Sequence, residues 1–372
     1  MTTGRWCIVT SVVRHAGQLD ASGFVRVVDL DSRRVVMKSL LPEARHRASD
    51  PNPRGGLRGA RGVAALPDRL VIANAERLFI VDSSWRRLGE ITHPWFGGVH
   101  DILGEEEGIW VACTSADLLL KVDWEGRLLA EWEWRRDERL VEALGFLRLP
   151  PVDRRVDYRD PQSMRGGVRN TVHLNAVSRG TDGLLLSFGR ILSPAAYRRR
   201  RLAATVGRLA VAAGIRGRRR PNSSGVAAHV GTTAGSSAAL VQLREDGSAA
   251  MLKSIPGTSV PNHNVIQIGD ALVYNDSNAD NVVATWLDGR HPDRVVRIPG
   301  DPGFVRGLAR LDGDTILVGS QAPAAIYLVN LRTGRVEAAI PLEGQSNESV
   351  YGIALIPPTF DPPPSRLDSA IR

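Results

Sequence analysis

Six short segments of the chain share a residue pattern that could bring reactive groups together. Each begins with a residue that can exchange hydrogen bonds, continues with a small residue or Asp/Asn, and then has an aliphatic one. The segments are Arg61-Gly62-Val63, His100-Asp101-Ile102, Asn175-Ala176-Val177, His263-Asn264-Val265, Arg306-Gly307-Leu308 and Tyr351-Gly352-Ile353. If the six are structurally equivalent, two imidazoles, two guanidinium groups, a carboxamide and a phenol meet in one place.

Neighbouring residues extend this candidate site. Side chains alternate between the two faces of a strand, so His173 shares a face with Asn175. Arg190 ends the adjacent strand pattern, 184–188, and reaches the same place. The predicted catalytic residues are His100, His173 and His263, and the predicted substrate-binding residues are Arg61, Asp101, Asn175, Arg190, Asn264, Arg306 and Tyr351.

This set of side chains suits an anionic or phenolic small molecule. A neutral imidazole can attack an electrophilic sulfur or phosphorus atom. A second imidazole can give a proton to the leaving phenol. Arginine and asparagine donors in a channel of low dielectric constant stabilise the charge that develops on oxygen. The residue types therefore favour group transfer to or from a small substrate.

The segments also predict the fold, because each opens a run of strand-forming residues. The clearest unit has four such runs separated by turn residues, at 61–65, 69–73, 78–81 and 87–91. The units that start at His100, His263 and Arg306 repeat this arrangement. Six similar units of this kind indicate an all-β fold, a six-bladed β-propeller.

The two ends of the chain complete the sixth unit. Residues 350–356 form a single inner strand, whereas 6–11, 24–30 and 34–38 are three strands without one. Pairing the C-terminal strand with the three N-terminal strands closes the ring and removes the open sheet edges. We therefore predict one propeller domain over residues 1–357, followed by a flexible tail, 358–372.

Two insertions interrupt the repeat, at 131–171 and 191–237. The first contains a candidate short helix, 140–147. The second lies in the third unit counted from Arg61 and has helix-forming composition over 195–213. Between Gly183 and Leu243 the chain has ten arginines and no acidic residue. A peripheral membrane or protein partner is therefore expected at 194–220, whereas nucleic acid is not, because Tyr197 alone offers base stacking there.

Bulk properties give further expectations. The net charge of +8 is local, because the ten arginines between Gly183 and Leu243 account for all of it. The sequence has no run of about 18 apolar residues, so no transmembrane helix is predicted. The N-terminus also lacks the apolar stretch of a signal peptide. Cys7 and Cys113 lie in apolar strand patterns and are expected to be free thiols. We expect a soluble cytoplasmic protein.

The order of the histidine motifs resembles the bacterial arylsulfate sulfotransferases. The motifs are His100-Asp101, His173-Leu174-Asn175, Leu186-Ser187-Phe188-Gly189-Arg190, Asn262-His263 and Tyr274-Asn275-Asp276-Ser277-Asn278. The resemblance covers residues 95–280 and implies a six-bladed propeller that moves a sulfuryl group between phenols through a sulfated histidine. It implies that His263 is the nucleophile, and that His100, His173, Asn175 and Arg190 hold the sulfate oxygens.

A second resemblance is to an uncharacterised family of bacterial cytosolic propellers. It rests on the openings His173-Leu174-Asn175 and Pro261-Asn262-His263-Asn264 and on the segment 302–309, and it covers about residues 95–320. It brings no activity with it.

Two other kinds of function remain open. His100, His173 and His263 could hold Zn²⁺ or Fe²⁺ as a three-histidine site for a lyase, hydrolase or oxygenase, although nearby arginines oppose a cation. A Ca²⁺ site would need axial carboxylates, for which Asp101 and Glu348 are the candidates. Alternatively, the propeller is a non-catalytic scaffold whose face binds a partner or glycan.

Overall fold

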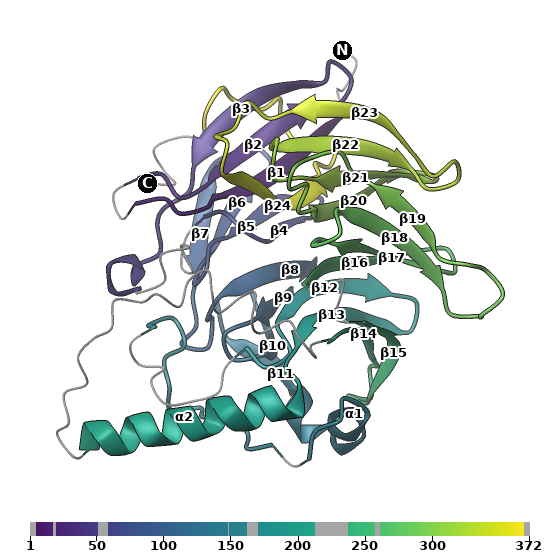
Figure 1. The fold of residues 1–372 in the computed structure, drawn as a ribbon. Helices are drawn as coiled ribbons and strands as arrows, with labels where there is room; N and C mark the ends of the chain where they lie inside the picture. The colour runs from purple at the N-terminus through teal and green to yellow at the C-terminus, as the bar shows by residue number, and fades with distance from the viewer. Residues whose placement is uncertain are drawn as a thin grey trace.

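The computed structural model describes residues 5–17, 20–50, 59–147, 149–161, 170–212, 237–256 and 261–367. In these residues the strands form six antiparallel sheets of four strands each. Figure 1 shows the sheets arranged like blades around a common centre. The predicted six-bladed propeller is therefore confirmed.

We name the sheets blades A to F in chain order. Blade A contains β24 (Glu348–Leu355), β1 (Trp6–Val13), β2 (Phe24–Asp29) and β3 (Arg34–Leu40). Blade B contains β4 (Val63–Ala65), β5 (Arg69–Ala73), β6 (Leu78–Asp82) and β7 (Arg87–Ile91). Blade C contains β8 (Val99–Glu105), β9 (Gly108–Cys113), β10 (Leu118–Val122) and β11 (Leu128–Glu133).

The remaining blades follow the same order from the inner to the outer strand. Blade D contains β12 (Leu174–Gly180), β13 (Gly183–Ile191), β14 (Ser237–Leu243) and β15 (Ala249–Ile255). Blade E contains β16 (Asn262–Ile268), β17 (Ala271–Asp276), β18 (Asn281–Trp286) and β19 (Arg294–Arg297). Blade F contains β20 (Arg306–Asp312), β21 (Thr315–Gly319), β22 (Ala325–Asn330) and β23 (Arg335–Pro341).

The inner strands form a closed ring. Each of β4, β8, β12, β16, β20 and β24 contacts the inner strand of the next blade, and β24 contacts β4. The C-terminal β24 pairs with β1, from Cys7 opposite Leu355 to Val13 opposite Glu348. The predicted closure by one C-terminal and three N-terminal strands is therefore confirmed.

Close approach of the inner strands explains the small second residue of the repeated pattern. A Cβ on Gly62 would lie 2.9 Å from Cα of Asp101 on the next blade, and a Cβ on Gly352 would lie 2.8 Å from the carbonyl oxygen of Arg61. Such contacts are shorter than van der Waals distances. The second residue of the pattern is therefore small because the inner strands approach closely near the axis. The first residue of the pattern is not limited in this way and can carry a functional side chain.

Aliphatic side chains fill the space between neighbouring blades. Between blades B and C, for example, Val71 and Ile80 pack against Val111 and Leu120 in one buried cluster. Burial of this apolar surface on both faces of each sheet fixes the angle at which blades meet. The packing therefore determines where each inner strand begins, and with it the position of the candidate site residues.

Helices occur in the two insertions and in one connection. They are η1 (Arg47–Ser49), η2 (Trp134–Arg136), α1 (Glu138–Ala143) and α2 (Pro194–Ala212). The carboxylate of Asp137 accepts from the amide of Leu140 at 2.9 Å, so α1 begins before the predicted 140–147. The predicted helix at 195–213 matches α2 of blade D, and the part of this insertion from 213 to 236 lies outside the described residues. No helix in the described ranges has the length and apolarity needed to cross a membrane.

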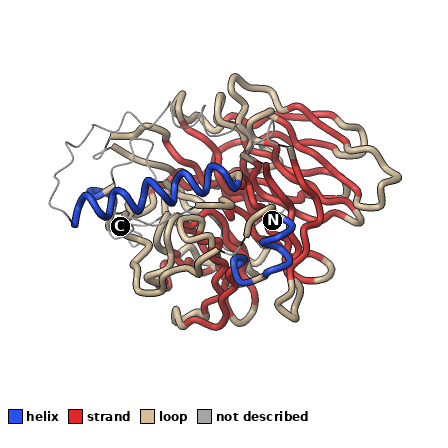
Figure 2. Tube along the Cα trace, turned by 60° about the horizontal axis from the view of Figure 1, so that its bottom comes forward, coloured by secondary structure: helices blue, strands red, loops and turns tan. Residues whose placement is uncertain are grey.

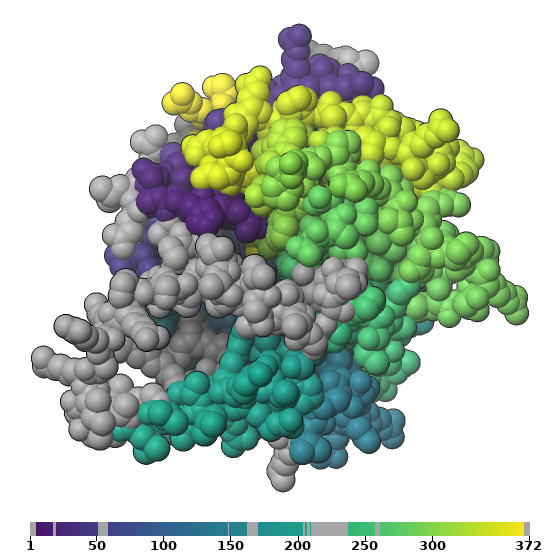
Figure 3. Space-filling view, viewed as in Figure 1, coloured from purple at the N-terminus to yellow at the C-terminus, as the bar shows by residue number. Residues whose placement is uncertain are grey.

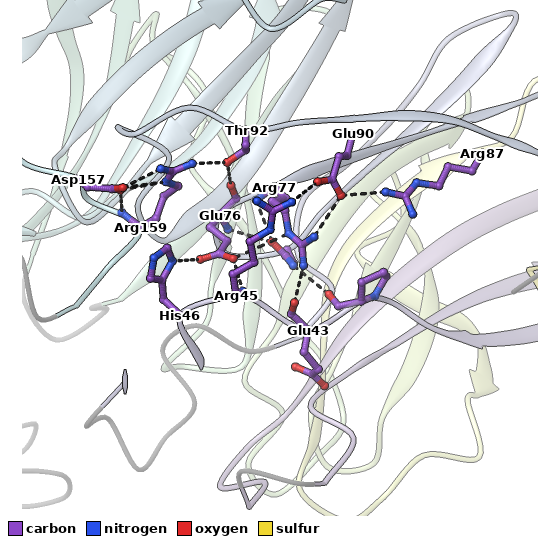
Figure 4. Close-up of polar contacts among 12 residues, drawn as sticks. Glu43, Arg45, His46, Glu76, Arg77, Arg87, Glu90, Thr92, Asp157 and Arg159 are labelled. Carbon is purple, nitrogen blue, oxygen red and sulfur yellow. Dashed lines mark hydrogen bonds and ion pairs between the residues drawn. The ribbon is translucent and has the colours of Figure 1, made fainter. Parts of the chain in front are cut away.

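A network of ion pairs and hydrogen bonds joins two segments to blade B: the connection before blade B, which carries His46, and the first insertion, which carries Arg159 (Figure 4). The buried carboxylate of Glu76 accepts from His46 Nδ1 at 2.8 Å, and Glu90 contacts Arg77 at 3.1 Å. Arg159, from the first insertion, donates to the hydroxyl of Thr92 at 3.2 Å. The part of the first insertion around Arg159 is thus held against the connection that follows blade B.

The segment after β24 packs on the outside of blades A and B. The side chains of Phe360 and Leu367 are buried, and the ring of Phe360 lies 5.7 Å from that of Trp85. The indole of Trp85 donates to the carbonyl of Asp361 at 2.8 Å. The segment expected to be flexible from residue 358 is therefore anchored up to Leu367, because it carries two apolar side chains that fit the blade surface.

Candidate active site at the axis

Seven side chains meet at the ends of the inner strands, and we call them the axial ring. They are Arg61, Tyr351, His100, His173, His263, Phe304 and Arg306. Ring centroids are 5.4 Å apart for Tyr351 and His100, and 4.9 Å apart for His100 and His173. The centroids are 6.0 Å apart for His173 and His263. Six predicted site residues are thus neighbours around a closed circle.

Two guanidinium groups complete this circle. Arg306 lies 4.9 Å from the ring centroid of Phe304 and 4.6 Å from that of Tyr351. Arg61 lies 5.5 Å from the centroid of Tyr351 and donates to the carbonyl of Val99 at 3.3 Å. The axial ring therefore has a cationic side, with Tyr351 between the two arginines, and an imidazole side.

His263 is fixed in one tautomer by its neighbour. Its Nδ1 lies 2.6 Å from Oγ of Ser277, and Ser277 donates its single hydroxyl proton to the carbonyl of Val305 at 2.5 Å. Oγ must then accept from Nδ1, so Nδ1 carries the proton and Nε2 carries the lone pair. This Nε2 is buried and has no hydrogen-bond partner among the described residues. His263 consequently presents an unsatisfied, nucleophilic nitrogen inside the axial ring.

His100 and His173 are held in the same way, by acceptors at Nδ1. The Nδ1 of His100 lies 2.8 Å from the carbonyl oxygen of Gly98, and that of His173 lies 2.8 Å from Oδ1 of Asn170. A carbonyl can only accept, so the more distant Arg61 nitrogen, 3.4 Å from His100 Nδ1, is a contact between two donors. All three imidazoles therefore carry their proton on Nδ1, the nitrogen that faces an acceptor of the surrounding protein.

Burial and positive charge keep His100 and His263 neutral. Burial lowers the pKa of His263 well below its usual value of 6.5, and the charges of Arg306 and Arg14 lower it further. The pKa of His100 is also lowered well below 6.5, first by burial and then by Arg61 and Arg306. Burial lowers the pKa of Arg306 as well. At neutral pH the axial ring thus combines the neutral imidazoles of His100 and His263 with guanidinium cations.

The turn of blade C positions His173 for this role. The buried carboxylate of Asp117 accepts from the amides of Thr171, Val172 and Leu174, and it lies 3.6 Å from a guanidinium nitrogen of Arg135. The hydroxyl of Thr114 donates to the carbonyl of Leu174 at 2.5 Å. These bonds fix the chain on both sides of His173, which has a positive φ of 53°.

Two other predicted site residues, Asn175 and Arg190, lie beside the axial ring. The amide of Asn175 donates to the carbonyl of Asn262 at 2.6 Å, so it joins blades D and E at the residue that precedes His263. Gly189 allows this approach, because a Cβ there would lie 2.2 Å from the Asn175 nitrogen. The backbone of Arg190 donates to Val172 at 3.3 Å, which places it at the end of the channel where His173 lies.

Asp101 and Asn264 line the channel but bond to the neighbouring blade. Asp101 accepts from the amide of Val177 at 3.3 Å, and Asn264 accepts from the amide of Gly307 at 2.9 Å. Both border an axial cavity of about 120 Å³, which is also lined by Val63, Val177, Leu308 and Ile353. Burial raises the pKa of Asp101 to about 7. Their oxygen atoms therefore connect neighbouring blades, and direct contact with a substrate stays a prediction.

Sequence reasoning missed three residues of the site: Arg14, Ser277 and Phe304. The guanidinium of Arg14 lies 4.4 Å from the ring centroid of Phe304. Arg14 and Ser277 each directly follow the second strand of a blade, close to the level of Arg190, the penultimate residue of β13. Arg190 was predicted because it follows the predicted strand next to an inner strand, and the same rule identifies Arg14 and Ser277. Phe304 precedes the pattern of blade F by two residues and carries no chemical signal of its own.

The geometry also bears on the metal alternatives. Over the described part of the chain, no group of three or more His, Cys, Asp or Glu residues is arranged to hold a metal ion. Glu348, a candidate Ca²⁺ ligand, is fully buried in an ion pair with Arg26 on blade A. The axial ring instead combines lone pairs with fixed positive charge, which suits an anionic or electrophilic ligand.

Comparison with known proteins identifies the fold and no activity. No family model and no curated protein matches the chain. A protein of unknown function from Bacteroides caccae is similar with a TM-score of 0.55 at 10% identity, over 95% of this chain and 99% of that one. Virginiamycin B lyase from Staphylococcus aureus is similar with a TM-score of 0.48 at 11% identity, over 96% and 93% of the two chains. The first has no known function and the second is a lyase, and at this identity the similarity concerns the fold alone.

Proposed function

We propose that the axial ring is the active site of a group-transfer enzyme, with His263 as the nucleophile and an aryl sulfate as the donor. The observation that carries this proposal is the buried Nε2 of His263, which has a fixed lone pair and no hydrogen-bond partner in the described ranges. The motif resemblance to the arylsulfate sulfotransferases names the transferred group. The substrate is a small phenolic or anionic molecule.

In the first step the Nε2 lone pair of His263 forms a bond to sulfur while the bond between sulfur and the phenolic oxygen breaks. The electron pair of that bond leaves with the phenol. Arg306 and Arg14 contribute the positive charge that lowers the pKa of His263, and the same charge stabilises the sulfuryl oxygens. In the second step an acceptor phenol attacks sulfur, and the lone pair returns to Nε2.

Proton transfer falls to the other imidazoles. In the second step a neutral imidazole, His100 or His173, takes the proton of the acceptor phenol as that oxygen attacks. By microscopic reversibility the same group, protonated, gives a proton to the leaving phenol in the first step. A bound sulfate ester supports that protonated form, because its negative charge offsets the arginines that depress the pKa of His100.

The proposal is tested with 4-nitrophenyl sulfate as donor and phenol as acceptor. We expect release of 4-nitrophenol, ping-pong kinetics and a sulfuryl adduct on His263 in the protein quenched with acid. His263→Ala should abolish both release and adduct. His291→Ala, which removes an exposed histidine of blade E, is the matched control and should retain both.

Two outcomes would overturn the assignment. Turnover retained by His263→Ala would exclude His263 as nucleophile. Wild-type protein that releases no 4-nitrophenol and forms no adduct with any aryl sulfate or phosphate ester would remove the group-transfer function. The propeller would then be a scaffold, and the triple variant H100A/H173A/H263A would bind its partner as the wild type does.

A further inference from the structure

Helix α2 is anchored to the propeller at its first turns. The ring of Tyr197 is buried and lies 5.8 Å from that of Phe146, beside α1. The hydroxyl of Ser193 accepts from the amide of Ala196 at 3.2 Å and caps the helix start. Figures 1 and 2 show α2 as a straight rod outside the ring of sheets. In the space-filling view of Figure 3, α2 lies in teal at the surface along one edge of the molecule.

One face of α2 is apolar and exposed. Leu202 is 67% exposed, Val206 is 56% exposed and Leu209 is 65% exposed. Their spacing of four and three residues places them within about 60° of arc, and Tyr197 lies on the opposite side of the helix. We call these three residues the apolar stripe. It therefore points away from the buried aromatic anchor of the helix.

Arginines frame the apolar stripe. Arg198 and Arg199 precede it on the same face, and Arg201 lies about 80° around the helix from Leu209; all three are exposed. We call them the arginine frame. No acidic residue occurs between Gly183 and Leu243, so no carboxylate of this segment neutralises the frame. A helix that combines an apolar face with arginines and no acidic residue has the composition of interfacial membrane helices.

Elsewhere in the described ranges, no helix or strand carries more than two large exposed apolar side chains. Leu88, Leu129 and Leu287 are also large and exposed, but they belong to blades B, C and E respectively. A single exposed leucine is ordinary on a protein surface. The clustering on α2, together with the arginine frame, is what requires an explanation.

The helix leaves the propeller at the end where the axial ring lies. Inner strands begin at that end, and β13, which runs antiparallel to β12, finishes there; Leu174 pairs with Phe188. The helix starts three residues after β13 ends, and the amide of Leu192 donates to Thr171 at 2.8 Å, next to the segment that carries His173. A surface bound by α2 would thus adjoin the entrance to the axial ring.

We propose that α2 docks the protein on an anionic lipid bilayer, with the apolar stripe at the acyl boundary and the arginine frame on the lipid phosphates. A bilayer fits both features at once, since it offers negative charge next to apolar chains. Nucleic acid would match the frame but gives no reason for three exposed aliphatic side chains, and the exposed face of α2 has no aromatic residue for base stacking. This inference stands apart from the proposed chemistry at His263.

Flotation of the full chain with lipid vesicles tests the proposal. We expect binding to phosphatidylcholine vesicles that contain phosphatidylglycerol, little binding to phosphatidylcholine alone, and weaker binding as salt is raised. The variant R198Q/R199Q/R201Q should lose about fivefold in affinity per arginine, about a hundredfold in total. The variant L202Q/V206N/L209Q should lose at least about tenfold.

Matched controls use exposed residues of the blades. L88Q/L129Q/L287Q removes the same kind of side chain, and R297Q/R310Q/R335Q removes three exposed arginines from blades E and F. Both should bind as the wild type does. In a second measurement, Val206→Cys is labelled with a polarity-sensitive dye, which is selective because Cys7 and Cys113 are buried. The dye should shift to the blue on anionic vesicles, and one on Leu129→Cys should not.

Three results would overturn the proposal. The apolar-stripe variant could bind anionic vesicles as tightly as the wild type. The wild type could be a dimer in solution that becomes monomeric in the apolar-stripe variant, so that a second copy covers the stripe. The arginine frame could be required for binding an oligonucleotide while the wild type fails to float with vesicles, which would make α2 a nucleic-acid surface.

Discussion

At the scale of single residues, orientation distinguishes His263 from an ordinary buried histidine. A buried imidazole normally satisfies both of its nitrogens with hydrogen bonds. Here the hydroxyl oxygen of Ser277 accepts a hydrogen bond from Nδ1, and the hydroxyl itself donates a hydrogen bond to a backbone carbonyl. The tautomer of His263 is therefore set by a residue outside the axial ring. Ser277 is therefore a positioning residue, and its contribution can be measured separately from that of His263.

Replacing Ser277 with Ala should remove the acceptor that keeps the proton of His263 on Nδ1, so that both neutral tautomers are populated. We expect kcat toward 4-nitrophenyl sulfate to fall by about tenfold to a hundredfold, with KM little changed, because the nucleophile is misoriented while the arginines remain. The ¹⁵N signals of His263 should move from a pure Nδ1–H tautomer to a mixture. Ser248→Ala, an exposed serine of a blade D turn, is the control. An unchanged ¹⁵N pattern in Ser277→Ala would contradict the role given to Ser277.

Anion binding should be coupled to proton uptake in the axial ring. His100 and His263 have pKa values well below 6.5 because of burial and of Arg61, Arg306 and Arg14, with His173 also facing His263. A bound sulfate offsets the positive charge and raises those pKa values, so its affinity should increase as the pH falls from about 8 to about 5.

Calorimetry in buffers of different ionisation enthalpy would measure the protons taken up with sulfate. His263→Gln should take up fewer protons than the wild type. If sulfate binds with the same affinity across this range and without proton uptake, the charge balance described for the axial ring is wrong.

The sequence predicted which residues meet at the axis better than it predicted what they do there. Arg61, His100, His173, His263, Arg306 and Tyr351 could be found because a recurring pattern shows which residue begins each blade. The hydrogen bonds of Asp101 and Asn264 to the next blade could not be predicted, because the pattern does not show whether a side chain points into the channel or toward a neighbouring blade. Arg14 and Ser277 lie just after the second strand of a blade, beyond the alternating pattern, so that only a position equivalent to that of Arg190 marks them.

At the scale of elements, each inner strand is positioned by its neighbours, and β12 shows how the turn of an adjacent blade does this. Strand runs and the extent of α2 followed from residue pattern and composition, since both depend on local propensity and on burial period. The bonds of Asp117 to the start of β12 did not, because they join residues 54 to 57 positions apart in the chain. Local patterns carry no information about such pairs.

Asp117→Ala should therefore loosen the segment that carries His173. The change leaves the amides of Thr171 and Val172 and the buried Arg135 without this acceptor, which we expect to cost about 3 kcal/mol in the free energy of unfolding. Urea denaturation followed by tryptophan fluorescence gives the value. Asp288→Ala, which removes an exposed carboxylate from a blade E turn, should leave the midpoint unchanged. A similar loss in both variants would show that Asp117 has no special role.

At the scale of the whole molecule, the propeller depends on blade A, whose strands come from both ends of the chain. The ends could be matched from the sequence, because one inner strand and three outer strands were left without partners. The interactions that hold the two ends of the chain together could not be predicted from the sequence. Arg26 of β2 and Glu348 of β24 form an ion pair in which both side chains are fully buried, and Ser11 of β1 donates to the same carboxylate.

The charge balance of this buried pair predicts an order of stability among variants. Glu348→Gln leaves the Arg26 guanidinium buried without its counter-charge, which should cost about 3–5 kcal/mol. The double variant R26M/E348Q removes that charge, while the new side-chain amide oxygen can still accept from Ser11, so it should be more stable than E348Q alone. Asp31→Asn, in the exposed pair with Arg5, should leave the urea midpoint unchanged. If the double variant is no more stable than E348Q, shape and hydrogen bonding close the ring, and the neutralisation of Arg26 contributes nothing to joining the two ends of the chain.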